Sequence, residues 1–547
     1  MHKNEFISLI KECISSGNVR LGILGLLITE LPPEIGELSD LLELYLTENQ
    51  LTDIPQDIGK LTRLEKLYIL KNRLSEIPPE IGDLTKLIKL NLTGNRIESL
   101  PPEIGNLIRL RKLNLSDNLI KSLPVEIGNL TNLQEIDISN NWLCELPKEI
   151  WKLSKLQKVN LSTRNFYYSD YGLTELPSEI RNLTDLRELN LDRNRLTGLP
   201  SEIGKMTNLT KLDIVQNRLT ELPSEIGKLR NLRELNLEQN RLTELPPEIA
   251  KLIKLEKLNL SENRVTGLPM WLWKLTNLQE LYFADNIHRL TKLPPDIGKL
   301  INLVQLDIKD NSITSLPAEI WNLKNMRELN LSNNMLIKLS AKVGRLTNLR
   351  RFNIANNKLK DIPSAIGNLI NLQALDIQYN HISKIPPEIF NLTNLKELIL
   401  LHNELTELPP EVGNLVNLSV LTITSNKLTE LPPEVGNLVN LRVLTISSNK
   451  LAELPPEIGN LANLELLIIS GNKLRELPHE IGKLTKLRRL DISKNQITEI
   501  PSEIGNLENI KQLEIDDNPL RIPPPEIVNQ GMTVVLSYLK KLMGSSI

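Results

Sequence analysis

Aromatic residues and cysteines are scarce in this chain of 547 residues. Phenylalanine, tryptophan and tyrosine together make up only 3% of the residues, so the core must be built from aliphatic side chains. The two cysteines, Cys13 and Cys144, lie far apart. This spacing argues against a disulfide-rich secreted scaffold and favours a reducing compartment. We therefore expect a cytoplasmic protein.

Long apolar runs and an excess of one charge are also missing. No run of 18 apolar residues occurs, so no transmembrane helix is expected. The N-terminal segment MHKNEFISLIKECISSG is too often interrupted by polar residues to resemble a signal peptide. The 65 basic and 67 acidic residues nearly cancel, which argues against nucleic acid or an anionic membrane as partner. We expect a protein partner, and no small-molecule substrate.

Leucine is abundant, and it recurs in a repeat of 23 residues. In LRKLNLSDN, residues 110–118, three leucines precede Asn118, and the same pattern ends 23 residues later at Asn141. We identify 22 such repeats, of which 20 carry asparagine at this position. Leu26 and Arg164 replace it in the other two. A period of this length indicates a solenoid rather than several globular domains.

The two halves of the repeat predict its local structure. In the first half, alternating leucines form a short strand whose inward side chains stack on the neighbouring repeats. The asparagine ends the strand, where its amide can bond to backbone groups of adjacent turns. The second half, LPPEIGNL in residues 100–107, allows a helical turn or two. One repeat cannot bury its own apolar face, so stability comes from stacking.

These features predict an α/β solenoid, a leucine-rich-repeat horseshoe or superhelix of about 22 repeats. It would have a parallel concave β-sheet, short convex helical turns and a helical cap at each end. We expect a capping helix in residues 1–17, one solenoid domain in 18–528 and a second capping helix in 529–547. The expected cap residues are Phe6, Ile7, Leu9, Ile10 and Ile14 at one end, and Val535, Leu536, Leu539 and Leu542 at the other.

The pattern LPPEIGNL–xx–Lxx–LxL–xx–NxL resembles the Ras-group leucine-rich-repeat family of plant intracellular proteins and animal scaffolds of small-GTPase signalling. The stretch NPLRIPPPEIVNQGMTVVLSYLKKL, residues 518–542, resembles the end of the repeat domain in Roco proteins, where a GTPase domain follows. The sequence contains no GxxxxGK[ST] motif, so the resemblance does not imply GTP hydrolysis. It implies a scaffold whose protein partner is a small GTPase or another signalling protein.

No residue pattern points to catalysis. The five histidines are scattered over different repeats, and the recurring glutamates are explained as residues at the start of helical turns. We expect no enzyme activity, no cofactor and no metal. The leading interpretation is a protein-binding scaffold. The alternatives are a regulatory arm for a separately encoded small GTPase or signalling enzyme, and a secreted effector or adhesin.

The outward-facing strand positions lie six, four and two residues before each asparagine. In most repeats they are polar, and charges alternate along the sixth position from Glu135 to Glu280. Four repeats differ, because most of their outward positions are aliphatic or carry hydroxyl groups. The resulting candidate protein-binding residues are Ile399, Leu401, Val420, Thr422, Val443, Thr445, Leu466 and Ile468. As an alternative, 411–428 and 434–451 are near copies, so Val420 and Val443 could record one duplicated change.

A second candidate surface is an insertion. The repeat that begins at Arg164 has 30 residues, and the excess falls in RNFYYSDYG, residues 164–172. Its aromatic residues are Phe166, Tyr167, Tyr168 and Tyr171. Tyrosine offers rigid area with a polar tip, which suits protein recognition. An aromatic plug that covers the interrupted asparagine row is the alternative.

Overall fold

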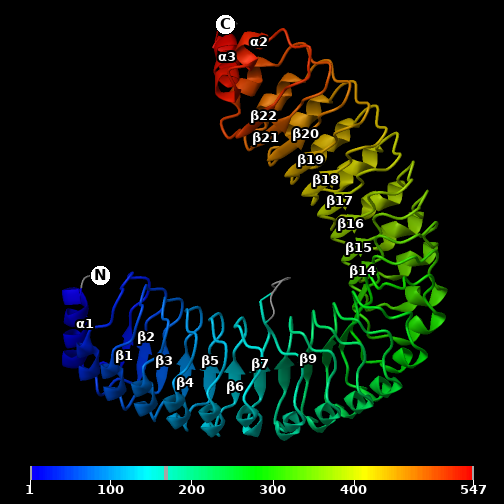
Figure 1. The fold of residues 1–547 in the computed structure, drawn as a ribbon. Helices are drawn as coiled ribbons and strands as arrows, with labels where there is room; N and C mark the ends of the chain where they lie inside the picture. Colours follow the sequence, from blue (N-terminus) through cyan, green and yellow to red (C-terminus); the bar gives the residue numbers. More distant parts are fainter. Residues whose placement is uncertain (1–2, 165–170, 545–547) are drawn as a thin grey trace. The chain divides into compact units, whose positions relative to one another are not determined.

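The computed structural model describes residues 3–164 and 171–544 (Figure 1). They belong to two compact units. Unit 1 holds Met1–Leu278 and Asn286–His288, and unit 2 holds Gln279–Asp285 and Arg289–Ile547. Each unit is a row of similar repeats, in which a short strand is followed by a 3-10 helical turn. The predicted leucine-rich-repeat solenoid is thereby confirmed.

Each strand has three residues and begins six residues before the asparagine position. The strands of unit 1 are β1 (Arg20–Gly22), β2 (Glu43–Tyr45), β3 (Lys66–Tyr68), β4 (Lys89–Asn91), β5 (Lys112–Asn114), β6 (Glu135–Asp137), β7 (Lys158–Asn160), β8 (Glu188–Asn190), β9 (Lys211–Asp213), β10 (Glu234–Asn236) and β11 (Lys257–Asn259). Those of unit 2 are β12 (Glu280–Tyr282), β13 (Gln305–Asp307), β14 (Glu328–Asn330), β15 (Arg351–Asn353), β16 (Ala374–Asp376), β17 (Glu397–Ile399), β18 (Val420–Thr422), β19 (Val443–Thr445), β20 (Leu466–Ile468), β21 (Arg489–Asp491) and β22 (Gln512–Glu514).

Neighbouring strands pair in parallel and in constant register. Leu235 of β10 lies opposite Leu258 of β11, 23 residues later, and both are fully buried. The side chains alternate between inward and outward directions as predicted from sequence. The middle residue of each strand points into the leucine core, and its neighbours point outward. The outward residues form the concave face of each unit.

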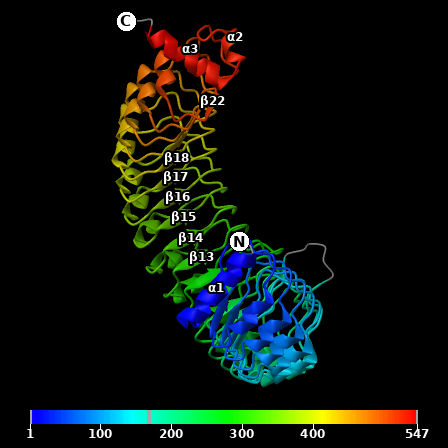
Figure 2. The same ribbon diagram turned by 90° about the vertical axis from the view of Figure 1, so that its left-hand side faces the viewer.

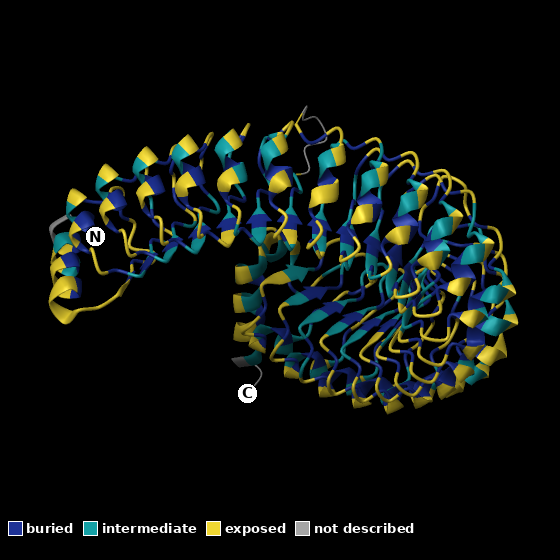
Figure 3. Cartoon of the chain, turned by 90° about the horizontal axis from the view of Figure 1, so that it is seen from below, coloured by how far each residue is buried: buried dark blue, intermediate teal, exposed yellow. Residues whose placement is uncertain are grey.

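The 3-10 turns have five residues each and lie on the opposite side of the repeats. They run from η1 (Pro33–Glu37) to η11 (Met270–Lys274) in unit 1, and from η12 (Pro295–Lys299) to η21 (Ser502–Asn506) in unit 2. Figure 3 shows exposed residues along the outer side of these turns. Most turns contain a glycine that packs against the next repeat. A Cβ on Gly227 would lie 2.4 Å from the carbonyl oxygen of Glu248.

The asparagine row forms the predicted hydrogen bonds. Asn240 Nδ2 donates to the carbonyl oxygens of Ile214, Leu237 and Glu238 at 2.7, 3.1 and 3.2 Å. Its Oδ1 accepts from the backbone N–H of Leu219 at 3.1 Å. One buried side chain thereby joins two consecutive repeats.

A second asparagine row, which the sequence analysis missed, lies nine residues before the first. Asn440 Nδ2 donates to the carbonyl oxygen of Val416 at 2.8 Å, and Asn463 bonds to Val439 at the same distance. Each bond links residues 24 positions apart, so this row also ties each repeat to the preceding one.

The caps are confirmed as helices, with one residue misassigned. Helix α1 (Lys3–Ser16) lies at the end of unit 1, and α2 (Pro525–Val528) and α3 (Met532–Gly544) lie at the end of unit 2 (Figure 2). Phe6 and Ile10 are buried as expected, but Ile14 is 46% exposed and Cys13 is buried instead. In α3, Val535 and Leu539 are buried, whereas Leu536 and Leu542 are half-buried.

Candidate binding surfaces

The aliphatic residues predicted from sequence lie together on the concave face of unit 2. Val420, Val443 and Leu466 occupy matching positions on β18, β19 and β20, so they form one continuous row. A parallel row contains Ile399, Thr422, Thr445 and Ile468, again in register. Leu401 follows β17. We call the eight residues Ile399, Leu401, Val420, Thr422, Val443, Thr445, Leu466 and Ile468 the aliphatic patch.

All eight side chains of the aliphatic patch are half-buried. Strands about 4.8 Å apart bring matching side chains into contact along each row, which covers their flanks. Their tips remain accessible to solvent, and they point away from the leucine core beneath. The patch is therefore flatter and less exposed than separate outward residues would be.

Charged residues border the aliphatic patch at both ends. In the first row, Glu397 precedes Val420, and Arg489 follows Leu466. Arg489 forms an ion pair with Glu514, with 2.9 Å between Nη2 and Oε1. In the second row, Asp376 precedes Ile399, and burial raises the pKa of its carboxyl group. An apolar centre with a charged border is the usual composition of a protein interface.

The second predicted surface, the insertion after Arg164, is described only at its two ends. Phe166, Tyr167 and Tyr168 lie outside the described residues. Tyr171 is 38% exposed and stacks on Trp142, with ring centroids 5.3 Å apart.

The described residues on either side of the insertion bond to neighbouring repeats. Arg164 forms an ion pair with Asp117 at 2.7 Å. At the interrupted asparagine row, Asn194 Nδ2 reaches the carbonyl oxygen of Leu161 at 2.9 Å, across 33 residues. The backbone N–H of Gly172 donates to Leu143 at 2.9 Å. The row therefore resumes directly after the insertion.

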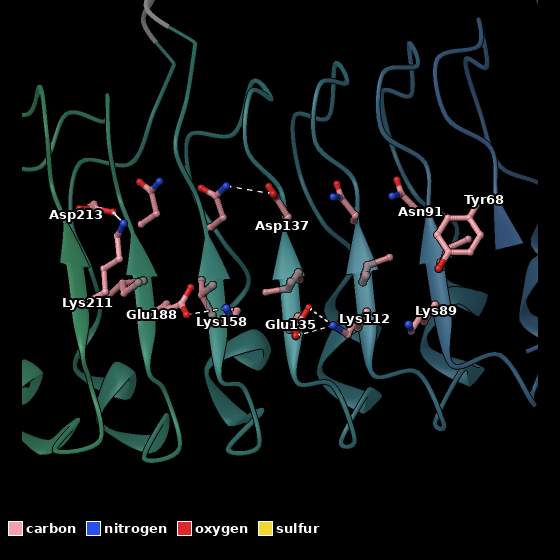
Figure 4. A pocket seen from close by; sticks show the side chains of 18 residues that line it. Tyr68, Lys89, Asn91, Lys112, Glu135, Asp137, Lys158, Glu188, Lys211 and Asp213 are labelled. Carbon is pink, nitrogen blue, oxygen red and sulfur yellow. Dashed lines mark hydrogen bonds and ion pairs between the residues drawn. The ribbon is translucent and has the colours of Figure 1, made fainter. Parts of the chain in front are cut away.

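Unit 1 carries a polar groove of about 440 Å³ on its concave face, lined by residues of β3 to β9 (Figure 4). The predicted charge alternation produces ion pairs there. Lys112 pairs with Glu135 at 2.7 Å, and Lys158 pairs with Glu188 at 2.6 Å. The alternation fails at one end of the groove, where Lys66, Lys89 and Lys112 occupy matching positions on three consecutive strands. These three lysines were not predicted as a site, although they recur in the sequence at a spacing of 23 residues.

Metal-binding clusters, membrane-spanning helices and disulfides are the other features that the described residues allow to be assessed. Residues 3–164 and 171–544 contain no group of three or more histidine, cysteine, aspartate or glutamate side chains that could hold a metal ion. In the same part of the chain, no helix is both long and apolar enough to cross a membrane. Cys13 and Cys144 form no disulfide.

The chain belongs to the leucine-rich-repeat family. A family model described as a leucine-rich repeat region matches residues 102–167, 211–288, 337–421 and 433–542. Related leucine-rich-repeat models match 62–120, 286–336 and 185–206. A search of curated protein sequences found no match.

Several solved structures share the fold. A leucine-rich-repeat protein of Leptospira interrogans is 37% identical, with a TM-score of 0.59 over 77% of this chain and 93% of that one. The plant peptide hormone receptor RGFR1, solved in complex with RGF2, is 31% identical, with a TM-score of 0.67 over 92% and 90% of the two chains. The Arabidopsis receptor kinase HAESA, solved with the peptide hormone IDA and the co-receptor SERK1, is 29% identical, with a TM-score of 0.67 over 92% and 87%.

Proposed function

We propose that this protein is a non-catalytic scaffold that binds a protein partner through the aliphatic patch on the concave face of unit 2. The observation that carries the proposal is the pair of in-register rows through Val443 and Thr445. Most of the same positions elsewhere carry charged or amide side chains, as Glu234 and Asn236 do in β10, so the fold does not require aliphatic residues there. Contact with a partner would bury the accessible tips of these side chains.

The solved relatives support a binding role. RGFR1 and HAESA are titled as complexes with peptide hormones, and these two chains are similar to ours over about nine-tenths of its length. The matched family models describe leucine-rich repeats and no catalytic domain. We infer that this chain also uses its repeats to bind a polypeptide.

The decisive experiment is the double variant Leu401→Glu with Val443→Glu. Partner capture from the native cell should be lost, because two carboxylates would have to be buried unpaired in the interface. A photo-crosslinking residue in place of Thr445 should label the captured partner, and one in place of Asn236 should not. The circular dichroism spectrum and melting temperature should stay close to those of the wild type, since neither side chain reaches the core.

The matched comparison is deletion of residues 165–171. If capture survives the double variant but fails in the deletion, the insertion is the binding surface and the proposal for the aliphatic patch is wrong. If both variants capture the partner normally, neither the aliphatic patch nor the insertion binds it.

A second candidate function is a regulatory arm for a separately encoded small GTPase. It is supported by the resemblance of residues 518–542 to the end of the Roco repeat domain, and those residues form α2 and α3 against the last repeats. We propose that this activity takes place in the cytoplasm, because the wide separation of Cys13 and Cys144 in sequence favours a reducing compartment. Pull-down with a small GTPase in its GDP-bound and GTP-bound forms tests it, and equal absence of binding to both would exclude it.

A further inference from the structure

We propose that the polar groove of unit 1 holds a carboxylate-binding site, centred on Lys89 and Asn91 of β4, that receives an acidic side chain of a polypeptide ligand. The inference rests on the proposed function only in taking the ligand to be a polypeptide. It concerns a different surface from the aliphatic patch.

The charges on neighbouring strands distinguish Lys89 from the lysines beside it. Five charged residues follow one another at matching positions on β2 to β6, in the order Glu43, Lys66, Lys89, Lys112 and Glu135. The outer two lysines are neutralised, because Lys66 pairs with Glu43 at 2.8 Å and Lys112 pairs with Glu135 at 2.7 Å. Within the described residues, the ammonium group of Lys89 has no ion-pair partner. It lies between two other lysines, where like charges on adjacent strands repel one another.

The charges next to this row do not change that balance. Glu65 and Arg111 immediately precede β3 and β5, and they add one charge of each sign. Arg20 at the far end also pairs with Glu43. Asp137 of β6 already accepts bonds from Ser139 and Asn160. The five residues of the row itself leave one positive charge, located at Lys89. Figure 4 shows Lys89 beside Asn91 and Tyr68 in the groove, without a dashed line to any residue drawn. An anion bound here would supply the missing countercharge.

Two amide side chains near Lys89 have oxygens that already accept hydrogen bonds. Asn91 Oδ1 accepts from the backbone N–H and the hydroxyl of Thr93, at 3.0 and 2.7 Å. Asn114 Oδ1 accepts from the backbone N–H and the hydroxyl of Ser116, at 2.9 and 2.7 Å. These bonds fix both amides with their oxygens occupied. In the part of the chain that the structure describes, neither NH2 group has an acceptor.

The groove wall at this point therefore presents three donor groups to a ligand: the ammonium of Lys89 and the amides of Asn91 and Asn114. A ligand that satisfies them must be rich in acceptors and negatively charged, which describes a carboxylate. Farther along the same row an amide donor is already satisfied, because Asn160 Nδ2 donates to Asp137 Oδ2 at 3.1 Å. On β4 and β5, two amides without an acceptor lie beside an ammonium group that has no ion-pair partner within the described residues.

A pair of stacked tyrosine rings lies beside the donor groups. Tyr68 lies next to Asn91 in register and stacks on Tyr45, with ring centroids 4.9 Å apart and an angle of 2° between the planes. The hydroxyl of Tyr45 donates to Glu43 at 2.8 Å, which holds the pair in place. The tyrosines provide a flat, partly apolar surface for the ligand residue beside the acidic one. The site therefore suits a polypeptide better than a free small anion.

The test uses fluorescein-labelled octapeptides of alanine and serine, acetylated and amidated at their ends. Each carries one glutamate and one phenylalanine, one to three residues apart, and matched peptides carry glutamine for glutamate. Fluorescence anisotropy should show binding of at least one glutamate peptide, with affinity reduced about tenfold or more in its glutamine counterpart. Added NaCl should weaken the binding. Absence of binding by every glutamate peptide at about 1 mM overturns the proposal.

The variants locate the site. Lys89→Met and Asn91→Asp should each reduce the affinity about tenfold or more, and the carboxylate introduced by the second change would still accept from Thr93, so folding is preserved. The matched control is Lys158→Met, three strands and roughly 14 Å away along the same groove, beyond the range of screened charge interactions. If Lys158→Met weakens binding as much as Lys89→Met does, the effect is a general field and the site is not at Lys89.

Two further measurements distinguish the carboxylate site from a phosphate site and from the aliphatic patch. A phosphoserine peptide that binds more tightly than the glutamate peptide would assign the site to phosphate and overturn the carboxylate assignment. The Leu401→Glu, Val443→Glu variant should bind the glutamate peptides as the wild type does. Failure of the aliphatic patch to capture a partner and failure of the carboxylate site are therefore recognised separately.

Discussion

At the scale of single residues, buried hydrogen-bonding groups and outward-facing groups differ most in how much they contribute to the stability of the fold. Asn240 holds two consecutive repeats together through four hydrogen bonds. Asn236, four residues earlier, lies half-buried on the concave face and accepts one weak bond from the N–H of Glu238 at 3.3 Å. The two asparagines are close in sequence but have unequal structural roles.

We therefore predict that Asn240→Ala lowers the free energy of unfolding by about 1–3 kcal/mol more than Asn236→Ala does, because it leaves buried backbone groups without partners. Chemical denaturation of the two variants measures the difference. Equal unfolding midpoints would contradict the assigned role of the asparagine row.

Asp192 is a second residue whose effect on the free energy of unfolding can be measured. Burial raises the pKa of its carboxyl group to about 6, although Oδ1 accepts a bond from the N–H of Val215 at 2.7 Å. The pKa in the unfolded chain is near 3.9, so ionisation increasingly destabilises the folded state as pH rises from about 4 to 6, and the cost persists above that.

Asp192→Asn removes the charge and keeps the acceptor oxygen. It should raise the free energy of unfolding at pH 7.5 by about 1–2 kcal/mol, with the gain disappearing near pH 4. Thermal melting at a series of pH values checks this, with the exposed Asp185→Asn as the surface control. A gain of the same size at pH 4 and pH 7.5 would show that the charge of Asp192 is not its cause.

At the scale of elements, the strands and turns were predictable because the repeat dictates them. Each strand begins six residues before the asparagine position, even at Leu26 and Arg164, where asparagine is absent. The buried face of the first capping helix was not predictable in the same way. Ile14 was expected on the buried face four residues after Ile10, but Cys13 occupies it, and its Sγ donates to the carbonyl oxygen of Asn18 at 3.2 Å. Helix periodicity alone does not distinguish positions three and four residues apart.

The glycine of the 3-10 turns gives a test of how closely repeats pack. Gly227→Ala should lower the free energy of unfolding by about 1–3 kcal/mol, because its Cβ would lie 2.4 Å from the Glu248 carbonyl oxygen. Gly198→Ala is the matched control, since a Cβ there meets nothing within 4 Å. That change should be neutral or stabilising by up to about 1 kcal/mol. Similar losses in both variants would mean that backbone flexibility, and not close packing, governs the effect.

The candidate sites were predictable only in part, for a physical reason. The aliphatic patch was visible because apolar residues at outward positions contrast with the rest of the repeat. The carboxylate-binding site depends on which polar groups remain unsatisfied, and that depends on bonds such as those of Asn91 to Thr93. The sequence shows three lysines at a spacing of 23 but not which of them already has a partner.

At the scale of the whole molecule, each repeat contacts and stabilises only the repeats next to it. Helix α3 covers the last turn, η21, and buries Val535 and Leu539. The contact is made with the adjacent end of the repeat row, so damage to the cap should stay local.

We predict that Leu539→Asp increases amide hydrogen exchange in β21 and β22 by about tenfold or more, while exchange in β13 and β14 changes little. Hydrogen-exchange mass spectrometry resolves these segments. The exposed change Lys540→Asp is the control for added charge. Uniformly faster exchange throughout unit 2 would show that the unit unfolds as one cooperative body.

The constant register of the repeats has a consequence for how the binding surface changes in evolution. Where the repeat has 23 residues, the asparagine bonds between repeats join residues 21, 24 or 26 positions apart, as those of Asn449 and Asn440 do. When gene copies misalign between the near-identical segments 411–428 and 434–451, recombination adds or removes 23 residues at once. Every bond then finds an equivalent partner in the next copy. The row through Val420 and Val443 therefore lengthens or shortens by one strand in a single genetic event, without any intermediate that fails to fold.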